Sequence, residues 1–441
     1  MKILILSYNY HPEPIGIAPL ITELAEGLVQ RGHQVRVVTA LPNYPERRIY
    51  AKYRGRLFHK EVLNGVHLVR HWVYIRPQPR LWTRLAFEAS TLLLSTWAAL
   101  MQPRADVTLT VSPQLSGSIT ARLLNLYKGI PFILNIQDLL PDAAIASGLL
   151  KSSLLISLFK ALERFAYRHA KGIAVISAPF IVNLTHKGVA PGKLYQIPNW
   201  VDTRFIVPLD RQTPLRRQMG LTDAFVVMYS GNIGLTQGLE TLIDCANLLR
   251  DDPKIQFVIV GEERALAQLR ERIQHYGLTN VYTIPFQPRP QLPQMLASVD
   301  VNLILQKAHI LDINMPSKTM LLMASARPVV ASVNPKGEVA KIIHESACGI
   351  IVQPEDPAQL AAALVALKND PEECQLLGER GRNFACENFD REKVLSTYEN
   401  LLQVAVNEKQ ATSRDVLANQ PKEEDHVEKS VRSRRDDRPY Q

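Results

Sequence analysis

Residues 225–239 read FVVMYSGNIGLTQGL, and this stretch decides the class of fold. The apolar run at its start, Phe225–Tyr229, is typical of a buried strand, and the sequence from Leu239 onward is typical of a helix. Between them, three glycines stand within eight residues: Gly231, Gly234 and Gly238. Glycines let a backbone approach a ligand closely, and a helix start behind them favours an anionic group. The stretch therefore predicts a binding loop in an α/β sheet; a plain connecting turn is the alternative.

Apolar runs of the same kind occur in two series, and helix-like segments separate most of them. The first series comprises Lys2–Leu6, Val35–Thr39, Val107–Val111, Phe132–Ile136 and Ile173–Ile176. The second comprises Phe225–Tyr229, Phe257–Val260, Val281–Ile284, Val299–Leu305, Pro328–Ala331 and Gly349–Val352. Strands that alternate with helices predict a parallel sheet covered on both faces.

A segment with proline and asparagine, Ile197–Asp202, separates the two series and is typical of a linker. We therefore predict two doubly wound α/β domains, residues 1–198 and 205–388, joined near residues 198–210. Ligands of such sheets bind outside the carboxyl ends of the strands. The expected site is a cleft between the two domains.

The composition is that of a folded protein with a sizeable core. The chain has 441 residues, of which 46% are hydrophobic and 21% charged, which suits two or three domains. Its four scattered cysteines do not suit a disulfide framework or a zinc ribbon, so a reducing, cytoplasmic setting is expected. No secretory signal is expected either, because the apolar run after Lys2 meets polar residues at once.

The formal net charge of +9 indicates an anionic partner. The tail, residues 407–441, holds eight basic and eight acidic residues and is expected to be disordered, so the excess charge lies on residues 1–406. Phosphorylated substrates and an acidic membrane surface both suit this charge. No nucleic acid partner is expected, because the arginine cluster Arg432–Arg438 has no interleaved aromatic residues. A basic surface that only limits self-association is the alternative.

Missing motifs disfavour several chemistries. The loop after the first strand, Ser7–Ala18, carries only Gly16 where a dinucleotide fingerprint needs three glycines, which weighs against a NAD-linked dehydrogenase. The chain has no Asp-x-Asp pair of the kind that clamps a divalent metal on nucleotide sugars, and no His/Cys cluster with zinc spacing. It also lacks a Walker loop and a Gly-x-Ser-x-Gly elbow.

A lysine near the start of a late helix is a second indication of a phosphate. Pro316 and Ser317 are typical of a helix start, which places Lys318 in the first turn. A cation there is unfavourable against the helix dipole by about 0.3–1 kcal/mol, and a bound phosphate would explain it. A solvated surface lysine is the alternative.

Residues 81–101 read LWTRLAFEASTLLLSTWAALM and are almost long enough to span a bilayer. Arg84 and Glu88 interrupt the apolar run. Two interpretations remain open for this segment. It is either an interfacial helix, with the preceding Arg76 and Arg80 at the lipid headgroups, or an ordinary core helix of the first domain.

Several motifs together resemble the retaining glycosyltransferases of family 4, in the WcaI/WbuB-like branch of exopolysaccharide and O-antigen synthesis. They are Tyr10–Gly16, Gly32-His33, Pro42–Pro45, Ile136–Asp138, Ile197–Trp200, Gly231–Gly234 with Gln237-Gly238, and Pro316–Lys318. The resemblance runs from Met1 to about Leu402. It implies the GT-B fold, in which two Rossmann-like domains face a cleft.

The resemblance also implies a role for individual residues. A nucleoside diphosphate sugar, used as co-substrate with no further cofactor, would bind the second domain through Ser230, Gly231, Asn232, Gln237, Gly238, Phe286, Asp312, Ser317 and Lys318. The acceptor would bind the first domain near Gly16, Asn43 and Tyr44. The residues implied in catalysis are Lys318, Asp138 and Glu13. The last helix, about 389–404, would cross back onto the first domain.

The chain departs from the broader family at the donor site. Asn232 and Gln237 stand where most members have arginine and lysine, and Gln137 stands where many have a histidine. Ile313 and Leu321 replace two glutamates. The WcaI-like branch shows similar replacements, which suggests a rewired donor site.

The reaction implied by the resemblance is sugar transfer with retention and without a metal. Loop amides and Lys318 would stabilise the leaving diphosphate, and a donor phosphate oxygen would take the acceptor proton. The implied acceptor is a glycan on an undecaprenyl diphosphate carrier, which the enzyme would meet as a peripheral protein at the cytoplasmic face of the membrane. Two alternatives share the fold: a nucleotide-sugar epimerase, which needs no acceptor, and a nucleotide-binding protein without catalysis.

Overall fold

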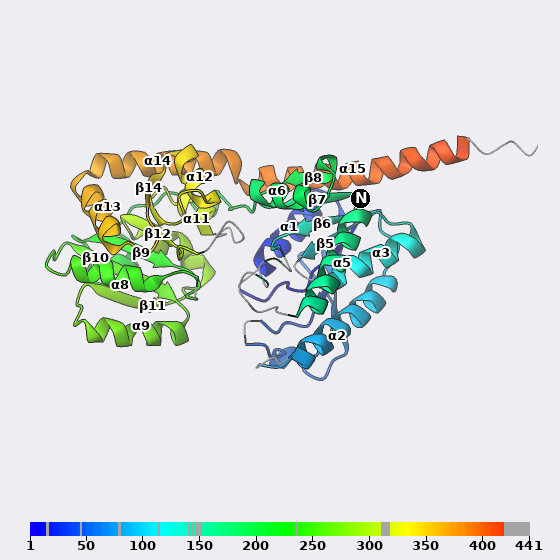
Figure 1. The fold of residues 1–441 in the computed structure, drawn as a ribbon, viewed down its shortest axis with the longest axis horizontal. Helices are drawn as coiled ribbons and strands as arrows, with labels where there is room; N and C mark the ends of the chain where they lie inside the picture. Colours follow the sequence, from blue (N-terminus) through cyan, green and yellow to red (C-terminus); the bar gives the residue numbers. More distant parts are fainter. Residues whose placement is uncertain are drawn as a thin grey trace, which may run out of the picture.

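The computed structural model describes most of the chain. The described residues are 1–14, 17–44, 46–77, 81–112, 115–139, 142, 145, 152–234, 236–309 and 318–418. They form two α/β domains (Figure 1). The prediction of two doubly wound sheets is confirmed.

The first domain is built on an eight-stranded sheet. Its strands are β1 (Lys2–Leu6), β2 (Gln34–Ala40), β3 (Phe58–Leu63), β4 (Val66–His71), β5 (Val107–Ser112), β6 (Phe132–Ile136), β7 (Gly172–Val175) and β8 (Leu194–Gln196). They lie in the order β3-β4-β2-β1-β5-β6-β7-β8. All neighbours pair in parallel except β3 and β4, which are antiparallel.

The second domain repeats the design with six parallel strands. They are β9 (Phe225–Ser230), β10 (Ile255–Gly261), β11 (Val281–Pro285), β12 (Val301–Leu305), β13 (Val329–Ser332) and β14 (Gly349–Val352), in the order β11-β10-β9-β12-β13-β14. The first strand of each domain, β1 or β9, lies between the next strand of the chain on one side and a later strand on the other. The chain therefore winds away from this strand in opposite directions. The loops after β1 and β9 therefore leave the two topological switch points, where ligands of such sheets bind.

Helices cover both sheets. Those of the first domain are α1 (Ala18–Gln30), α2 (Leu81–Leu100), α3 (Leu115–Lys128), α5 (Ser153–His169) and α6 (Ala178–His186). Those of the second are α7 (Pro214–Gln218), α8 (Leu239–Leu248), α9 (Glu263–His275), α10 (Leu292–Ala297), α11 (Lys318–Ala324), α12 (Glu338–Ser346), α13 (Pro357–Asn369) and α14 (Pro371–Asn388). Buried strand residues and the inner helix faces form the cores.

The sequence pattern missed β3, β4 and β8. The first two form a hairpin around Asn64-Gly65, and β3 is an edge strand that alternates exposed and half-buried residues. Continuous apolar runs indicate strands that are covered on both faces, so an edge hairpin escapes that search. The strand β8 has only three residues, too few for any pattern.

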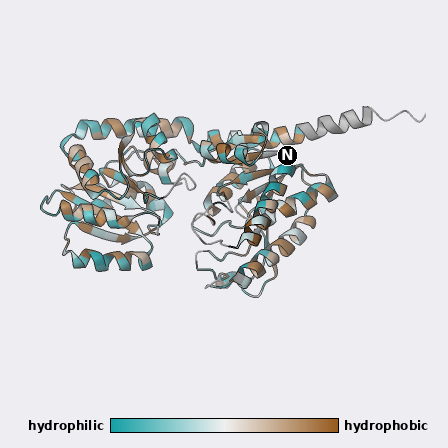
Figure 2. Cartoon of the chain, viewed as in Figure 1, coloured by the Kyte–Doolittle hydropathy of each residue, from teal (hydrophilic) through white to brown (hydrophobic). Residues whose placement is uncertain are grey.

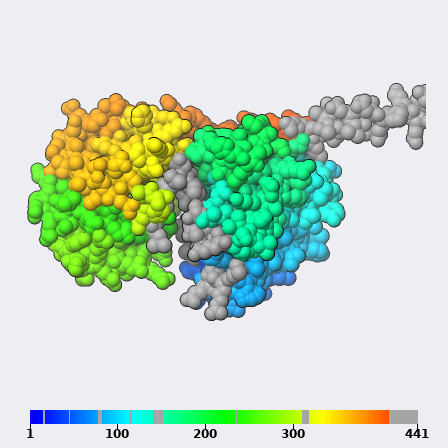
Figure 3. All heavy atoms as spheres, in the orientation of Figure 1, coloured from blue at the N-terminus to red at the C-terminus, as the bar shows by residue number. Residues whose placement is uncertain are grey.

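The last helix, α15 (Arg391–Ala418), joins the two domains. It continues from the second domain and packs on the first, where Leu395, Tyr398 and Leu402 enter the core. Arg31, the residue that follows α1, binds Glu392 at 3.0 Å and Glu399 at 2.9 Å. In Figure 3 this connection runs along one side of the two lobes.

Two expectations about this end of the chain need correction. The helix was expected to end near residue 404, and residues 407–441 were expected to be disordered, but α15 continues to Ala418. Residues 408–411, Glu-Lys-Gln-Ala, have high helix propensity, which the balance of charges alone did not reveal. Residues 419–441 lie outside the described residues.

Candidate active site

The glycine loop leaves the central strand of the second sheet. Ser230 is the last residue of β9, and Gly231 follows with φ 145°, a conformation that side chains rarely adopt. Its N–H donates a hydrogen bond to the Val260 carbonyl at 3.1 Å. The buried hydroxyl of Tyr229 donates to the Asn232 carbonyl at 2.7 Å. These bonds fix the first half of the loop against the ends of β9 and β10.

The second half of the loop leads into helix α8. The side-chain Oε1 of Gln237 accepts a hydrogen bond from the Gly234 N–H at 2.9 Å. Gly238 caps α8 with φ 63°, and a Cβ there would come within 3.3 Å of the Lys307 side chain. Leu235 lies outside the described residues. Among the described ones, Asn232 and Gly234 are exposed, so their side of the loop is open to a ligand.

The turn after β11 lies beside this loop. The Phe286 N–H donates to the Gly261 carbonyl at 3.1 Å, and a Cβ on Gly261 would come within 2.3 Å of the Ile233 side chain. Phe286 thus reaches the glycine loop through Gly261 and Ile233. The residue is 45% exposed, although a phenylalanine gains by burial. An exposed phenylalanine offers an apolar surface to a ring of a ligand.

Lys318 is the cation of this site. Its Nζ lies 3.7 Å from the centroid of the Tyr229 ring and donates to the Ser230 carbonyl at 3.3 Å. Burial lowers the pKa of the Lys318 ammonium to about 7. No carboxylate among the described residues pairs with it. The alternative of a lysine free in solvent therefore does not fit, and the loop and Lys318 are brought together as predicted from the sequence.

A second lysine at this loop escaped the sequence analysis. Lys307 follows the end of β12, its N–H donates to the Thr236 carbonyl at 2.9 Å, and its side chain touches Gly238. Two lysines thus flank the two ends of the glycine loop. The strand-end rule, applied to the run Val299–Leu305, would have found it. Asp312 and Ser317, which the resemblance places at the donor, lie outside the described residues.

On the first domain, Glu13 ties two loops together. Its side chain is buried, 4% exposed, and Oε1 accepts from the N–H groups of Asn43 and Tyr44, each at 2.8 Å. Oε2 accepts from the Asn9 side chain at 2.7 Å. Both carboxylate oxygens are thus engaged by the protein. The expected catalytic role requires an oxygen that is free to meet a substrate, so this arrangement does not favour that role.

Asn43 is engaged in the same way. Its Nδ2 donates to the Leu41 carbonyl and its Oδ1 accepts from the Tyr8 hydroxyl, each at 2.8 Å. Burial is the main reason that the pKa of Tyr8 is raised. Tyr44, by contrast, exposes its ring at the surface. Of the three residues expected to bind the acceptor, Tyr44 alone presents a side chain that is described and free, and Gly16 lies outside the described residues.

Two carboxyl groups of the first domain have raised pKa values. Asp138 lies two residues after β6 and is exposed. The protein around its carboxyl nevertheless excludes part of the water, which raises the pKa of that carboxyl to about 6. Glu88 of α2 has a pKa raised to about 7 by burial, and its neighbour Phe87 packs edge-on against Tyr8 with 5.2 Å between ring centroids. Asp138 was predicted as a site residue and Glu88 was not, because a glutamate in an apolar helix looks like a surface charge.

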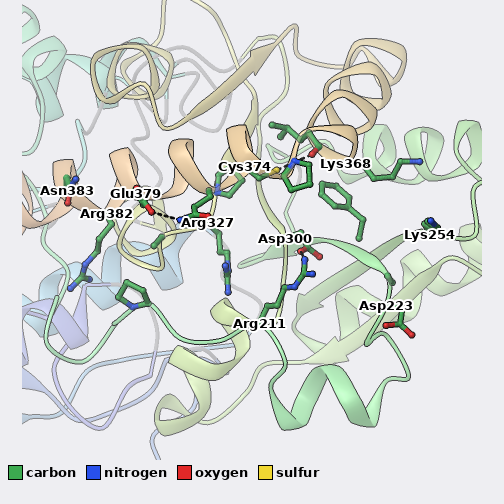
Figure 4. Close-up of a pocket in the computed structure, with 18 residues that line it drawn as sticks. Arg211, Asp223, Lys254, Asp300, Arg327, Lys368, Cys374, Glu379, Arg382 and Asn383 are labelled. Carbon is green, nitrogen blue, oxygen red and sulfur yellow. Dashed lines mark hydrogen bonds and ion pairs between the residues drawn. The ribbon is translucent and has the colours of Figure 1, made fainter.

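A cavity of about 870 Å³ in the second domain is not this site (Figure 4). It lies at the opposite edge of the sheet, near Phe225, Asp300 and Pro328 at the amino ends of β9, β12 and β13. Its arginines are already engaged, since Arg211 binds Asp300 at 2.7 Å and Arg382 donates to the carbonyls of Ile206, Ala324 and Thr203. We assign its arginines a structural role.

Comparison with known proteins identifies the family. The model of the glycosyl transferase 4-like domain matches residues 16–200, and that of glycosyl transferases group 1 matches residues 212–384. The chain is 32% identical to WcaI of Escherichia coli K12, named a putative colanic acid biosynthesis glycosyl transferase, over 91% of this chain and 99% of that protein. The chain belongs to the WcaI-like branch of family 4. It is a glycosyltransferase.

Other relatives of this transferase agree. The probable glycosyltransferase WbjE of Pseudomonas aeruginosa is 26% identical over 58% of this chain and 65% of that protein. Among solved structures, sucrose-phosphate synthase from Thermosynechococcus elongatus has a TM-score of 0.69 at 18% identity, covering 91% of this chain and 98% of that one. Anabaena HepE in complex with UDP-glucose has a TM-score of 0.68, also at 18% identity, over 92% and 100%. These likenesses confirm the GT-B fold.

Proposed function

We propose that this transferase moves a sugar from a nucleoside diphosphate sugar to a glycan acceptor with retention and without a metal ion. The observation that carries the proposal is Lys318, a largely buried cation without a carboxylate partner among the described residues, set at the end of β9 against a glycine loop. A buried charge without a counter-charge is costly. A diphosphate in the loop would supply that counter-charge.

The reaction follows from where charge develops. The bond between the anomeric carbon and the diphosphate oxygen breaks, and negative charge grows on the diphosphate. Lys318 at one end of the loop and Lys307 at the other would stabilise that charge. The acceptor oxygen forms the new bond on the face that the diphosphate leaves, and its proton passes to a phosphate oxygen.

The first domain would hold the acceptor. We assign Glu13 and Asn43 a positioning role, because their polar atoms hold the loops after β1 and β2. Tyr44 and Asp138 have accessible side chains and would contact the acceptor. The carboxylate of Asp138 would orient the attacking hydroxyl by accepting a hydrogen bond from it.

The acceptor that we propose is a glycan on an undecaprenyl diphosphate carrier in cell-surface polysaccharide synthesis. The name of the Escherichia coli relative, which refers to colanic acid, supports this class of product. Within the described part of the chain, none of the helices is long and apolar enough to cross a bilayer. One side of α2 packs on the domain, and the other side exposes Leu93 and Trp97. We propose that the protein meets this carrier as a peripheral protein at the cytoplasmic face of the membrane, with the exposed side of α2 turned toward the carrier.

The proposal is tested in two steps with the purified full chain. A thermal-shift screen of nucleoside diphosphates and their sugars should find a ligand that raises the melting temperature, because a ligand of the folded state alone stabilises it. Lys318→Ala should abolish the shift, and Lys341→Ala, at an exposed lysine of α12, should keep it. The active nucleotide sugar is then incubated with lipid extract. Donor turnover without acceptor would indicate the epimerase, and nucleotide binding without any product would indicate a binding protein.

A further inference from the structure

A second cavity, of about 710 Å³, lies in the first domain beside the acceptor loops. It is lined by Arg48 from the segment after β2, by Tyr74 and Arg76 from the segment after β4, and by Trp82 and Ala86 of α2. Because β2 lies between β1 and β4 and pairs in parallel with both, the segments after β2 and β4 leave the same end of the sheet as the Glu13 loop. The cavity is therefore on the acceptor side of the molecule.

The cavity combines two cations with two aromatic rings. The Arg76 guanidinium lies 5.7 Å from the Tyr74 ring centroid, and its Nε is 3.4 Å from the Tyr74 hydroxyl. The exposed guanidinium of Arg48 has no carboxylate partner among the described residues, and neither has that of Arg76. Arginine pairs of this kind suit phosphate oxygens, while the exposed ring of Trp82 offers a flat face to a sugar.

The cavity opens onto an apolar stripe. Trp82, Ala86, Ala89, Leu93 and Trp97 follow one another at intervals of four, three, four and four residues, which places them on one face of α2. Trp82 is 60% exposed, Leu93 70% and Trp97 58%. At 1.5 Å per residue the stripe runs for about 22 Å from the cavity. Figure 2 shows the apolar character of α2 among the helices of this domain.

The opposite face of α2 explains why the stripe is not core. Thr91, Ser95, Ala98 and Ala99 are buried there, and the helix packs on α3, β2 and β4. A core helix needs one apolar face, and α2 has apolar residues on both. The exposed face, continuous with a cationic cavity, requires an occupant that is anionic at one end and apolar along its length.

We propose that this cavity and stripe form the binding site for the diphosphate and the lipid chain of a polyprenyl-diphosphate-linked acceptor. Arg48 and Arg76 hold the diphosphate, Trp82 and Tyr74 border the first sugar, and Leu93 and Trp97 contact the isoprenoid chain. The proposal rests on the proposed function, since it locates the acceptor of that reaction. It assigns a role to residues outside the donor loop.

The test measures binding of farnesyl diphosphate, a soluble isoprenoid diphosphate, to the full chain by calorimetry. We expect Arg48→Ala/Arg76→Ala to weaken binding at least tenfold, because hydrogen bonds to charged groups contribute about 1.5–3 kcal/mol and 1.4 kcal/mol is tenfold in affinity. Lys60→Ala/Arg104→Ala, which removes two exposed cations elsewhere in the domain, should bind as the wild type does. Leu93→Gln/Trp97→Gln should weaken farnesyl diphosphate and leave inorganic diphosphate unchanged.

The remaining arms separate this site from its alternatives. Saturating UDP should not displace farnesyl diphosphate, and displacement would place the probe in the donor loop and overturn the proposal. Equal binding by wild type and Arg48→Ala/Arg76→Ala would also overturn it. A third result would overturn it as well: the protein floats with phosphatidylglycerol vesicles only when both arginines are present, and farnesyl diphosphate does not bind. The surface would then be a contact with the bilayer. Absence of sugar transfer with intact farnesyl diphosphate binding would instead contradict the proposed function.

Discussion

The two domains treat a buried charge in opposite ways. On the second domain, Lys318 has a carbonyl and an aromatic ring as neighbours, and no carboxylate among the described residues balances it. On the first domain, Glu13 occupies a comparable place after the first strand and accepts three hydrogen bonds. A charge that the fold satisfies holds the structure together. A charge that it leaves unsatisfied is available to a ligand.

The largest effect should come from the unsatisfied charge. Lys318→Ala should lower the turnover number by about 100- to 1,000-fold, which is the usual effect of removing one group that stabilises a developing anion. The folded state should persist, because no counter-charge is stranded. Steady-state transfer with saturating donor and far-ultraviolet circular dichroism would measure both, with Lys341→Ala as the matched control. Turnover within a factor of three of wild type would remove Lys318 from the reaction.

At Glu13, the charge that the fold satisfies, a substitution should lower stability more than it lowers turnover. Glu13→Ala leaves the N–H groups of Asn43 and Tyr44 without their partner in a buried place, and each such group costs about 1–3 kcal/mol. We expect the free energy of unfolding, measured in urea, to fall by about 2–4 kcal/mol. Glu13→Gln keeps the acceptor oxygen and should recover part of it. A stable Glu13→Ala protein with no activity would contradict the positioning role and restore a catalytic one.

The two regions also differ in how much of their structure the sequence predicts. The glycine loop and Lys318 were predictable, because glycine spacing and a cation at a helix start are local signals. The engagement of Glu13 was not, since its partners at Asn43 and Tyr44 lie about 30 residues away and only the pairing of β1 with β2 brings them near. The hairpin of β3 and β4, which carries the segment with Arg76, was missed for a related reason. Edge strands lack the continuous apolar run of buried ones.

A smaller effect is expected at Asp138, whose pKa is raised to about 6. If its carboxylate orients the hydroxyl of the sugar acceptor, turnover should fall as the pH drops through 6. Protonation removes the negative charge to which that hydroxyl donates its hydrogen bond. Asp138→Asn should lower turnover about tenfold at pH 7.5 and abolish this part of the pH profile. The matched control is Asp106→Asn, which lies at the opposite end of the sheet and accepts from the Lys2 N–H. If the fall in turnover at low pH is unchanged in Asp138→Asn, the titration belongs to another group, for example Glu88, whose pKa is raised to about 7.

Proton uptake on ligand binding shows whether the Lys318 amino group meets the diphosphate. In the free protein the pKa of Lys318 is about 7, so at pH 8 its amino group is mostly neutral. A diphosphate against it should raise that pKa well above 8 and draw roughly one proton from the buffer. Calorimetry of nucleoside diphosphate binding at pH 8, in two buffers of different ionisation enthalpy, measures this uptake. We predict close to one proton for the wild type and none for Lys318→Met; no uptake by the wild type, or the same uptake by both, would contradict the central claim.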